Sequence, residues 1–135
     1  MDIIKEIKKR EGYSPIVYQC SEGYDTIGYG FAIKDLYLDK ASCDKILERK
    51  ISELKLQLHQ KFDWFKDAPD RVQDVVINMC YQLGIRGFSK FKKTIYYLET
   101  EQYEEASIEM LDSLWAKQTP NRAKELSAEI ASMAN

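Results

Sequence analysis

Histidine, cysteine and long apolar runs are scarce in this chain of 135 residues, and each scarcity excludes a class of protein. With a single histidine, His59, no histidine cluster can form a zinc site. The three cysteines, Cys20, Cys43 and Cys80, are an odd number without a CxxC pair, so we expect free thiols rather than a disulfide framework. No apolar run approaches the roughly 20 residues of a membrane-spanning helix. The sequence therefore predicts a soluble globular protein that holds no metal.

The chain also lacks a basic excess. It has 20 Lys and Arg residues and 22 Asp and Glu residues, which gives a net charge of -2. Nucleic-acid binding needs clustered cations that neutralise phosphates. The short basic runs at 8–10 and 90–93 are typical of a solvated helix face, and no recognition-helix pattern accompanies them. We therefore exclude nucleic acid as a partner.

The first twelve residues alternate apolar and charged side chains. They lack the continuous apolar stretch and the small-residue cleavage site of a secretory signal. We therefore expect a protein that is made in the cytoplasm and reaches any other compartment without a signal of its own.

A short helix over residues 2–11 is predicted by Asp2 as N-cap, by isoleucines at positions 3, 4 and 7, and by Gly12 as C-cap. The apolar stripe continues onto Glu11, which places a carboxylate on the face expected to be buried. Burial and the negative end of the helix dipole both disfavour ionisation, so the pKa of Glu11 is expected to rise. A carboxylic acid that stays protonated near neutral pH suits general-acid cleavage of a glycosidic bond. An ion pair with an arginine at a lobe boundary explains the position at least as well.

Residues 13–33 are rich in Tyr, Ile, Val and Gly around a turn signal at 21–23. This composition predicts short antiparallel strands at about 16–19, 24–28 and 30–33. Gly28 and Gly30 resemble the start of a dinucleotide fingerprint, but Ile33 stands where the third glycine belongs and no phosphate-binding helix follows. We therefore expect no cofactor.

Helical periodicity dominates the remainder of the chain. It predicts a long helix at about 39–60, a central buried helix opened by Asp67 and Pro69 and ended by Gly84, shorter helices at about 90–99 and 102–114, and a last helix capped by Thr119-Pro120. The predicted fold class is α+β, mostly helical, in a single domain over residues 1–135. Its parts are a hairpin lobe at about 13–38, a connecting helix at about 39–60, and a helical lobe at about 61–135 against which helix 2–11 packs.

Three blocks of sequence carry a family signature. The first places Glu11, Cys20 and Thr26 in a pattern of a glutamate, eight residues, an aspartate or sometimes a cysteine, five residues, and a threonine. The second is INMCYQLG at 77–84 and the third is WAKQTPNRAK at 115–124. In this order the blocks resemble the phage-type lysozymes, or endolysins, of glycoside hydrolase family 24. The resemblance spans most of the chain and implies a lysozyme-like fold.

The resemblance also implies a role for each matched residue. Glu11 protonates the leaving glycosidic oxygen, Thr26 holds the attacking water, and Arg122 pairs with Glu11 to fix its orientation. Further residues are candidates for contact with sugar, the last two being weaker: Tyr81, Gln82, Ala32 and Phe91.

Position 20 departs from the aspartate that most of the family has. Glycosidases generally use two carboxylates, and a thiol is fully charged near pH 7 only if its pKa falls from about 8.5. No cation that would lower the pKa is obvious near the hairpin, although Lys34 or Arg122 could approach. Three interpretations stay open: Cys20 acts as a thiolate that positions water or attacks the sugar, Glu22 or Asp25 carries the charge, or the enzyme is weak or inactive. We favour Cys20; Asp25 is the poorest substitute because it neighbours the threonine on a strand and points to the opposite face.

The predicted activity is that of a bacteriolytic muramidase, which cleaves the β-1,4 bond between N-acetylmuramic acid and N-acetylglucosamine for host cell lysis. The alternatives are a weak or inactive peptidoglycan-binding homologue, supported by Cys20, and a lytic transglycosylase, against which Thr26 argues because it orients water. The resemblance implies peptidoglycan glycan strands as substrate and synthesis in the host cytoplasm. It also implies release to the cell wall in the periplasm by a holin or equivalent. We expect a monomer.

Overall fold

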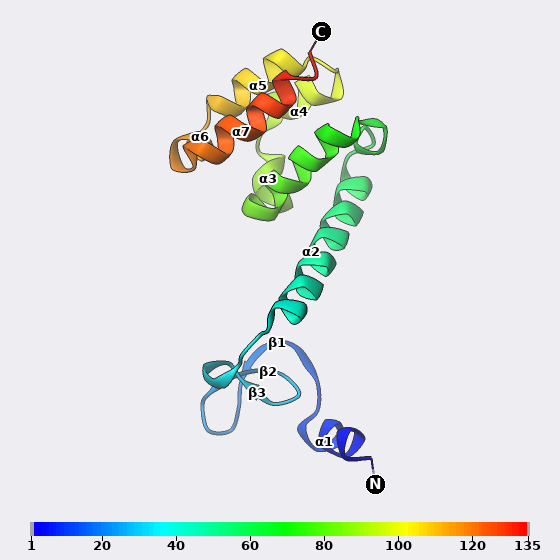
Figure 1. Cartoon of the computed structure of the whole chain (residues 1–135), viewed down its shortest axis with the longest axis vertical. Coiled ribbons are helices and arrows are strands. Elements are labelled where there is room, and N and C mark those ends of the chain that lie inside the picture. Colours follow the sequence, from blue (N-terminus) through cyan, green and yellow to red (C-terminus); the bar gives the residue numbers. More distant parts are fainter. Residues whose placement is uncertain (1, 135) are drawn as a thin grey trace. The chain divides into compact units, whose positions relative to one another are not determined.

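The computed structural model describes residues 2–134, which form seven α-helices, two short 3-10 helices and one three-stranded antiparallel sheet (Figure 1). The fold class is α+β, as the sequence predicts. Backbone contacts divide the chain into two compact units, Met1–Cys43 and Asp44–Asn135. Within the described residues, no helix combines the length and the apolar character needed to cross a membrane.

Helix α1 (Ile3–Glu11) begins and ends where its capping residues predict. The Asp2 carboxylate accepts hydrogen bonds from the backbone N–H groups of Ile4 at 3.1 Å and Lys5 at 3.3 Å. Gly12 takes a φ of 70° at the C-cap. Within its own unit α1 contains no buried residue, and its predicted packing against the helical lobe joins two units and stays a prediction. The small sheet of the same unit leaves the isoleucines of α1 exposed.

The sheet consists of β1 (Ser14–Gln19), β2 (Asp25–Gly28) and β3 (Phe31–Ala32) in the order β1-β2-β3. All three predicted strands are therefore present, with ends that differ by one or two residues. A turn closes β1 onto β2, because the N–H of Gly23 donates to the Cys20 carbonyl and the N–H of Cys20 donates to the Tyr24 carbonyl, both at 2.9 Å. A 3-10 helix, η1 (Ile33–Asp35), follows β3.

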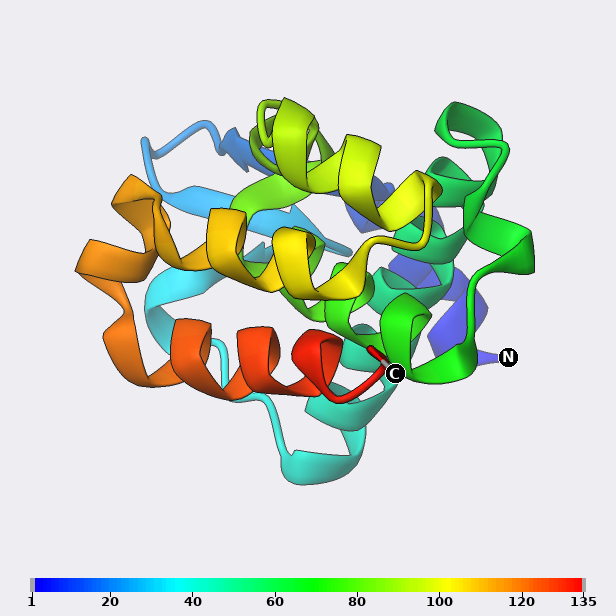
Figure 2. The same ribbon diagram turned by 90° about the horizontal axis from the view of Figure 1, so that it is seen from above.

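Helix α2 (Lys40–Lys61) follows directly after Asp39, whose carboxylate accepts from the Ser42 N–H at 2.8 Å. Of its predicted apolar stripe only Leu58 is buried. After η2 (Phe65–Asp67) come α3 (Asp70–Ser89), α4 (Lys92–Glu99), α5 (Tyr103–Leu111), α6 (Leu114–Gln118) and α7 (Pro120–Ala131). Helices α5 and α7 lie side by side (Figure 2). The core of this unit is built around fully buried side chains of α3, α5, α7 and their neighbours, which include Phe65, Val72, Val76, Met79, Phe88, Met110 and Ile130.

The boundary at the end of α3 differs from the prediction in detail, and the start of α7 matches it. At Gly84 the backbone leaves the helical region, with φ 74° and ψ 161°, so the central helix breaks at the predicted residue and a further helical segment runs on to Ser89. Thr119 is the N-cap of α7 and Pro120 is its first residue, as predicted. The Thr119 hydroxyl makes no capping hydrogen bond to α7; it donates to the Trp115 carbonyl at 2.9 Å, which also accepts from the Thr119 N–H at 2.8 Å.

Candidate active site

Glu11 ends α1 beside the turn that joins β2 to β3. A Cβ atom added at Gly30 would overlap Glu11 Oε2 and lie 3.0 Å from Glu11 Cδ. The carboxylate therefore occupies the space that a side chain at position 30 would need. Gly30 also has a φ of 75°, in the left-handed region that favours glycine. Position 30 thus requires glycine both for its backbone and for the acid beside it.

The structure confirms the predicted position of Glu11 on its helix. Glu11 is the last residue of α1, so it does sit at the negative end of a helix dipole. Its own unit leaves the side chain exposed beside the backbone of Gly30, and the predicted burial, which depends on the helical lobe, stays a prediction.

Thr26 lies on β2 at the centre of the sheet, opposite Tyr18 on β1 and Ala32 on β3. This register buries the threonine, which is only 3% exposed. Its hydroxyl donates a hydrogen bond to the Tyr24 carbonyl at 2.9 Å. The lone pairs of the oxygen then remain to accept a hydrogen bond from another group.

Cys20 stands at the start of the β1–β2 turn and is partly exposed. The backbone N–H groups of Tyr24 and Glu22 hydrogen-bond to its sulfur and lower the pKa of the thiol. The hydroxyl of Thr26 acts in the same direction, while partial burial and the Glu22 carboxylate oppose it. Hydrogen-bond donors in the turn, rather than the cation considered from the sequence, therefore lower the pKa of Cys20. Lys34, one of the two cations considered there, lies instead against Asp35 and the Tyr24 ring.

The other two cysteines have different surroundings. Cys43 is exposed at the start of α2. Cys80 is buried in the core of the helical unit, and this burial raises the pKa of its thiol to about 12. Of the three free thiols, Cys20 is therefore the one whose environment favours the thiolate, the form that can accept a proton or act as a nucleophile.

The remaining predicted residues belong to the helical unit. Arg122, in the first turn of α7, donates from Nε to Asn78 Oδ1 at 2.9 Å and from a terminal nitrogen to the same oxygen and to the Asn78 carbonyl. This anchors the guanidinium on α3. The predicted pairing of Arg122 with Glu11 joins residues of different units and stays a prediction.

Tyr81 and Gln82 lie on α3 outside its buried stripe, as predicted. Tyr81 is exposed and lines a hollow of about 410 Å³ together with residues of α2. Gln82 Oε1 accepts a hydrogen bond from Trp115 Nε1 at 2.8 Å. The amide oxygen is therefore occupied, which leaves the amide NH₂ group to donate to a ligand.

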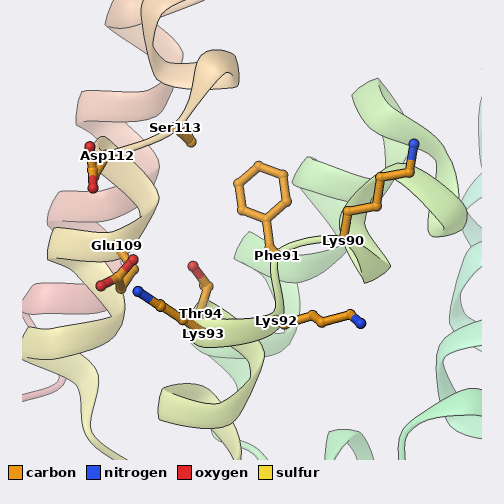
Figure 3. A pocket seen from close by; sticks show the side chains of 8 residues that line it. All are labelled: Lys90, Phe91, Lys92, Lys93, Thr94, Glu109, Asp112 and Ser113. Carbon is orange, nitrogen blue, oxygen red and sulfur yellow. The ribbon is translucent and has the colours of Figure 1, made fainter.

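Phe91 lies at the junction of α3 and α4. Its ring packs against Phe88 and Trp115, with centroid distances of 6.4 and 6.0 Å. It also lines a hollow of about 290 Å³, in which lysines of the α3–α4 junction lie on one side and Glu109, Asp112 and Ser113 on the other (Figure 3). An aromatic ring at the edge of a polar hollow suits contact with a sugar.

Three residues that position these groups were missed from the sequence: Gly30, Asn78 and Trp115. Asn78 and Trp115 lie inside the second and third sequence blocks, next to the residues they hold. Their position inside those blocks was the one signal in the sequence that could have identified them as positioning residues. Nothing in the spacing of Gly28 and Gly30 indicated that a carboxylate from another element fills the space at Gly30.

The sequence profile of the phage lysozyme family matches residues 8–128, which include both the acid–hairpin block and the blocks of the helical unit. The chain belongs to the phage lysozyme family. This membership supports a lysozyme-type peptidoglycan hydrolase, an enzyme of the glycoside hydrolase class.

Individual relatives agree with the phage lysozyme assignment. The chain is 29% identical to probable T4-type lysozyme 2 of Dictyostelium discoideum, over 87% of this chain and 86% of that protein. It is 26% identical to probable T4-type lysozyme 1 of the same organism, over the same shares. It is also 27% identical to the pre-baseplate central spike protein Gp5 of Enterobacteria phage T4, over 91% of this chain but only 26% of the spike protein. The chain therefore spans about a quarter of the length of that relative.

Proposed function

We propose that this phage lysozyme family member hydrolyses the β-1,4 bond between N-acetylmuramic acid and N-acetylglucosamine in peptidoglycan. The observation that supports this most directly is the arrangement of three residues around the small sheet. Cys20 and Thr26 lie together at the β1–β2 hairpin, and Glu11 lies against Gly30 in the turn between β2 and β3. Glycoside hydrolysis needs a proton donor for the leaving oxygen and a second group that manages water. These three residues supply both functions from one unit of the chain.

In this proposal Glu11 gives its proton to the glycosidic oxygen as the bond to the anomeric carbon breaks. Water adds to that carbon and loses a proton to the Cys20 thiolate. The Thr26 oxygen accepts a hydrogen bond from the water and orients it. The thiolate replaces the carboxylate that most glycosidases use, and the N–H groups of the turn stabilise its charge. Arg122 orients Glu11, while Ala32, Tyr81, Gln82 and Phe91 contact sugar.

The decisive test replaces Glu11. Glu11→Gln keeps the shape of the side chain and removes the proton that it donates, so the loss of turbidity of a peptidoglycan suspension should slow by at least about 100-fold. Glu6→Gln is the matched control, since Glu6 lies on the same helix and pairs with Arg10 at 2.7 Å. Walls that dissolve as fast with Glu11→Gln as with wild type would overturn the proposal.

The role of Cys20 is tested separately. We expect Cys20→Asp to retain activity, because a carboxylate supplies the same negative charge, and Cys20→Ser and Cys20→Ala to lose most of it. Fully active Cys20→Ala would remove the residue from the mechanism.

A second candidate is a protein that binds peptidoglycan without cleaving it, and the cysteine in place of the usual aspartate favours it. Wild type and Glu11→Gln would then both sediment with peptidoglycan and neither would release muropeptides. Mass spectrometry of any products also separates hydrolysis from transglycosylation, because hydrolysis adds one water at each cut and transglycosylation leaves an anhydro end.

The biological setting that we propose follows from the same activity. The protein is made in the cytoplasm of a bacterial host, is released by a holin or an equivalent, and acts as a monomer on the wall during lysis. Loss of lysis on deletion of the gene, with rescue by wild type and not by Glu11→Gln, tests this setting.

A further inference from the structure

Two rows of side chains cross the sheet on the face that carries Thr26. Tyr18, Thr26 and Ala32 are register partners and form the first row. One step nearer the β1–β2 turn, the N–H of Cys20 donates to the Tyr24 carbonyl at 2.9 Å. Alternate residues of a strand share a face, so Tyr24 lies on the same face as Thr26.

Lys34 extends this second row beyond Tyr24. Its Nζ lies 4.9 Å from the centroid of the Tyr24 ring and 3.3 Å from Asp35 Oδ2. The sequence has no other Lys or Arg between residues 11 and 39, so Lys34 supplies the positive charge of the hairpin. A hollow of about 380 Å³ beside this pair lies at the edge of the sheet, since it is lined by Tyr24 and Lys34 and also by Gln19 and Asp25, which alternate with the Thr26 row.

The two sugars of a peptidoglycan strand differ in charge. Muramic acid carries a lactyl arm that ends in a carboxylate, or in a peptide with further carboxylates, whereas N-acetylglucosamine carries none. An ammonium group binds a carboxylate by a charge-assisted hydrogen bond, and a tyrosine ring offers an apolar surface to the carbon skeleton beside it. Tyr24 lies on the face that carries Thr26, and the Lys34 ammonium lies over its ring, so the pair offers both groups beside the hairpin residues Cys20 and Thr26.

We propose that Tyr24 and Lys34 form a subsite for a carboxylate on the muramic acid arm. The subsite rests on the proposed function, since it requires the glycan strand to cross this face. The two sugars alternate along the strand, so holding the charged one at this row decides which of the two kinds of β-1,4 bond reaches Glu11. The subsite therefore sets bond selectivity, while the three catalytic residues perform the cleavage.

The test compares Lys34→Gln with the matched control Lys8→Gln, whose Nζ lies 5.2 Å from the centroid of the Tyr29 ring in the same unit. Calorimetry measures binding to peptide-free glycan strands and to chitin oligosaccharides, which have no carboxylate. Lys34→Gln should weaken binding to the strands about tenfold, equivalent to about 1.4 kcal/mol, and leave chitin binding unchanged. Lys8→Gln should change neither. Equal effects of the two variants on both peptide-free and peptide-bearing strands, or an equal loss on chitin, would refute the subsite.

Peptide-bearing strands identify which carboxylate binds. A loss confined to them assigns the carboxylate to the stem peptide, and a loss on peptide-free strands assigns it to the lactyl group; either result supports the subsite. Cleavage of the same strands separates this inference from the proposed function. Binding that depends on Lys34 without any cleavage would refute the function alone. Cleavage by Lys34→Gln with the same efficiency and the same reducing-end sugar as wild type would refute the subsite alone.

Discussion

Replacing Gly30 by alanine tests whether the hairpin positions the catalytic acid. An alanine at a φ of 75° costs about 1–2 kcal/mol of folding free energy. The new Cβ would also overlap Glu11 Oε2, and because this oxygen is at the far end of a flexible side chain it can move aside at little further cost in stability. An acid moved by about an ångström from its productive position loses on the order of 100-fold in rate. We therefore expect Gly30→Ala to be slightly destabilised and strongly impaired in kcat.

Gly23→Ala is the matched control. Gly23 has a φ of 85° in the same unit, but a Cβ there meets nothing within 4 Å. Urea unfolding should show a similar loss of stability in both variants, while initial rates of peptidoglycan hydrolysis should fall steeply only in Gly30→Ala. For Gly30→Ala we expect a loss in kcat of about 100-fold. A Gly30→Ala enzyme that keeps more than about half of the wild-type kcat would refute this expectation. A Gly23→Ala enzyme whose kcat falls as far as that of Gly30→Ala would also refute it.

Three further outcomes concern the thiols and the core. Iodoacetamide should alkylate Cys20 at a lower pH than Cys43, because the turn lowers the pKa of the Cys20 thiol; identical pH profiles by mass spectrometry would contradict this. Because the pKa of the Cys80 thiol is about 12, the folded protein keeps that proton above pH 9, where the unfolded chain loses it. The free energy of unfolding should therefore fall between about pH 9 and 12, and less steeply in Cys80→Val. Met79→Ala should cost about 2–5 kcal/mol in urea unfolding, since Met79 is 0% exposed. Leu111→Ala, at a position 47% exposed, should cost less than about 1 kcal/mol.

Elements defined by local signals were predictable from the sequence. Asp2 and Gly12 bound α1, the glycine at position 84 breaks α3, and the turn after Cys20 closes a hairpin. Each of these depends on neighbours within a few residues. The buried face of α3 was equally clear, because Val72, Val76 and Met79 recur at helical spacing.

Features that depend on distant partners were not predictable in the same way. The apolar stripe of α1 indicated a buried Glu11, but periodicity says which face is apolar and not whether anything covers it. The pKa of Cys20 is lowered by the N–H groups of Glu22 and Tyr24, whose directions are set by the turn geometry rather than by residue type. The anchoring of Arg122 on Asn78 joins residues 44 positions apart.

The Thr26 hydroxyl has one proton and two neighbours that can take it, the Tyr24 carbonyl and the Cys20 sulfur. We expect the hydroxyl to donate to the sulfur when the thiol is ionised and to the carbonyl when the thiol keeps its proton. A valine at position 26 would then both remove the acceptor for water and make the thiol a weaker acid.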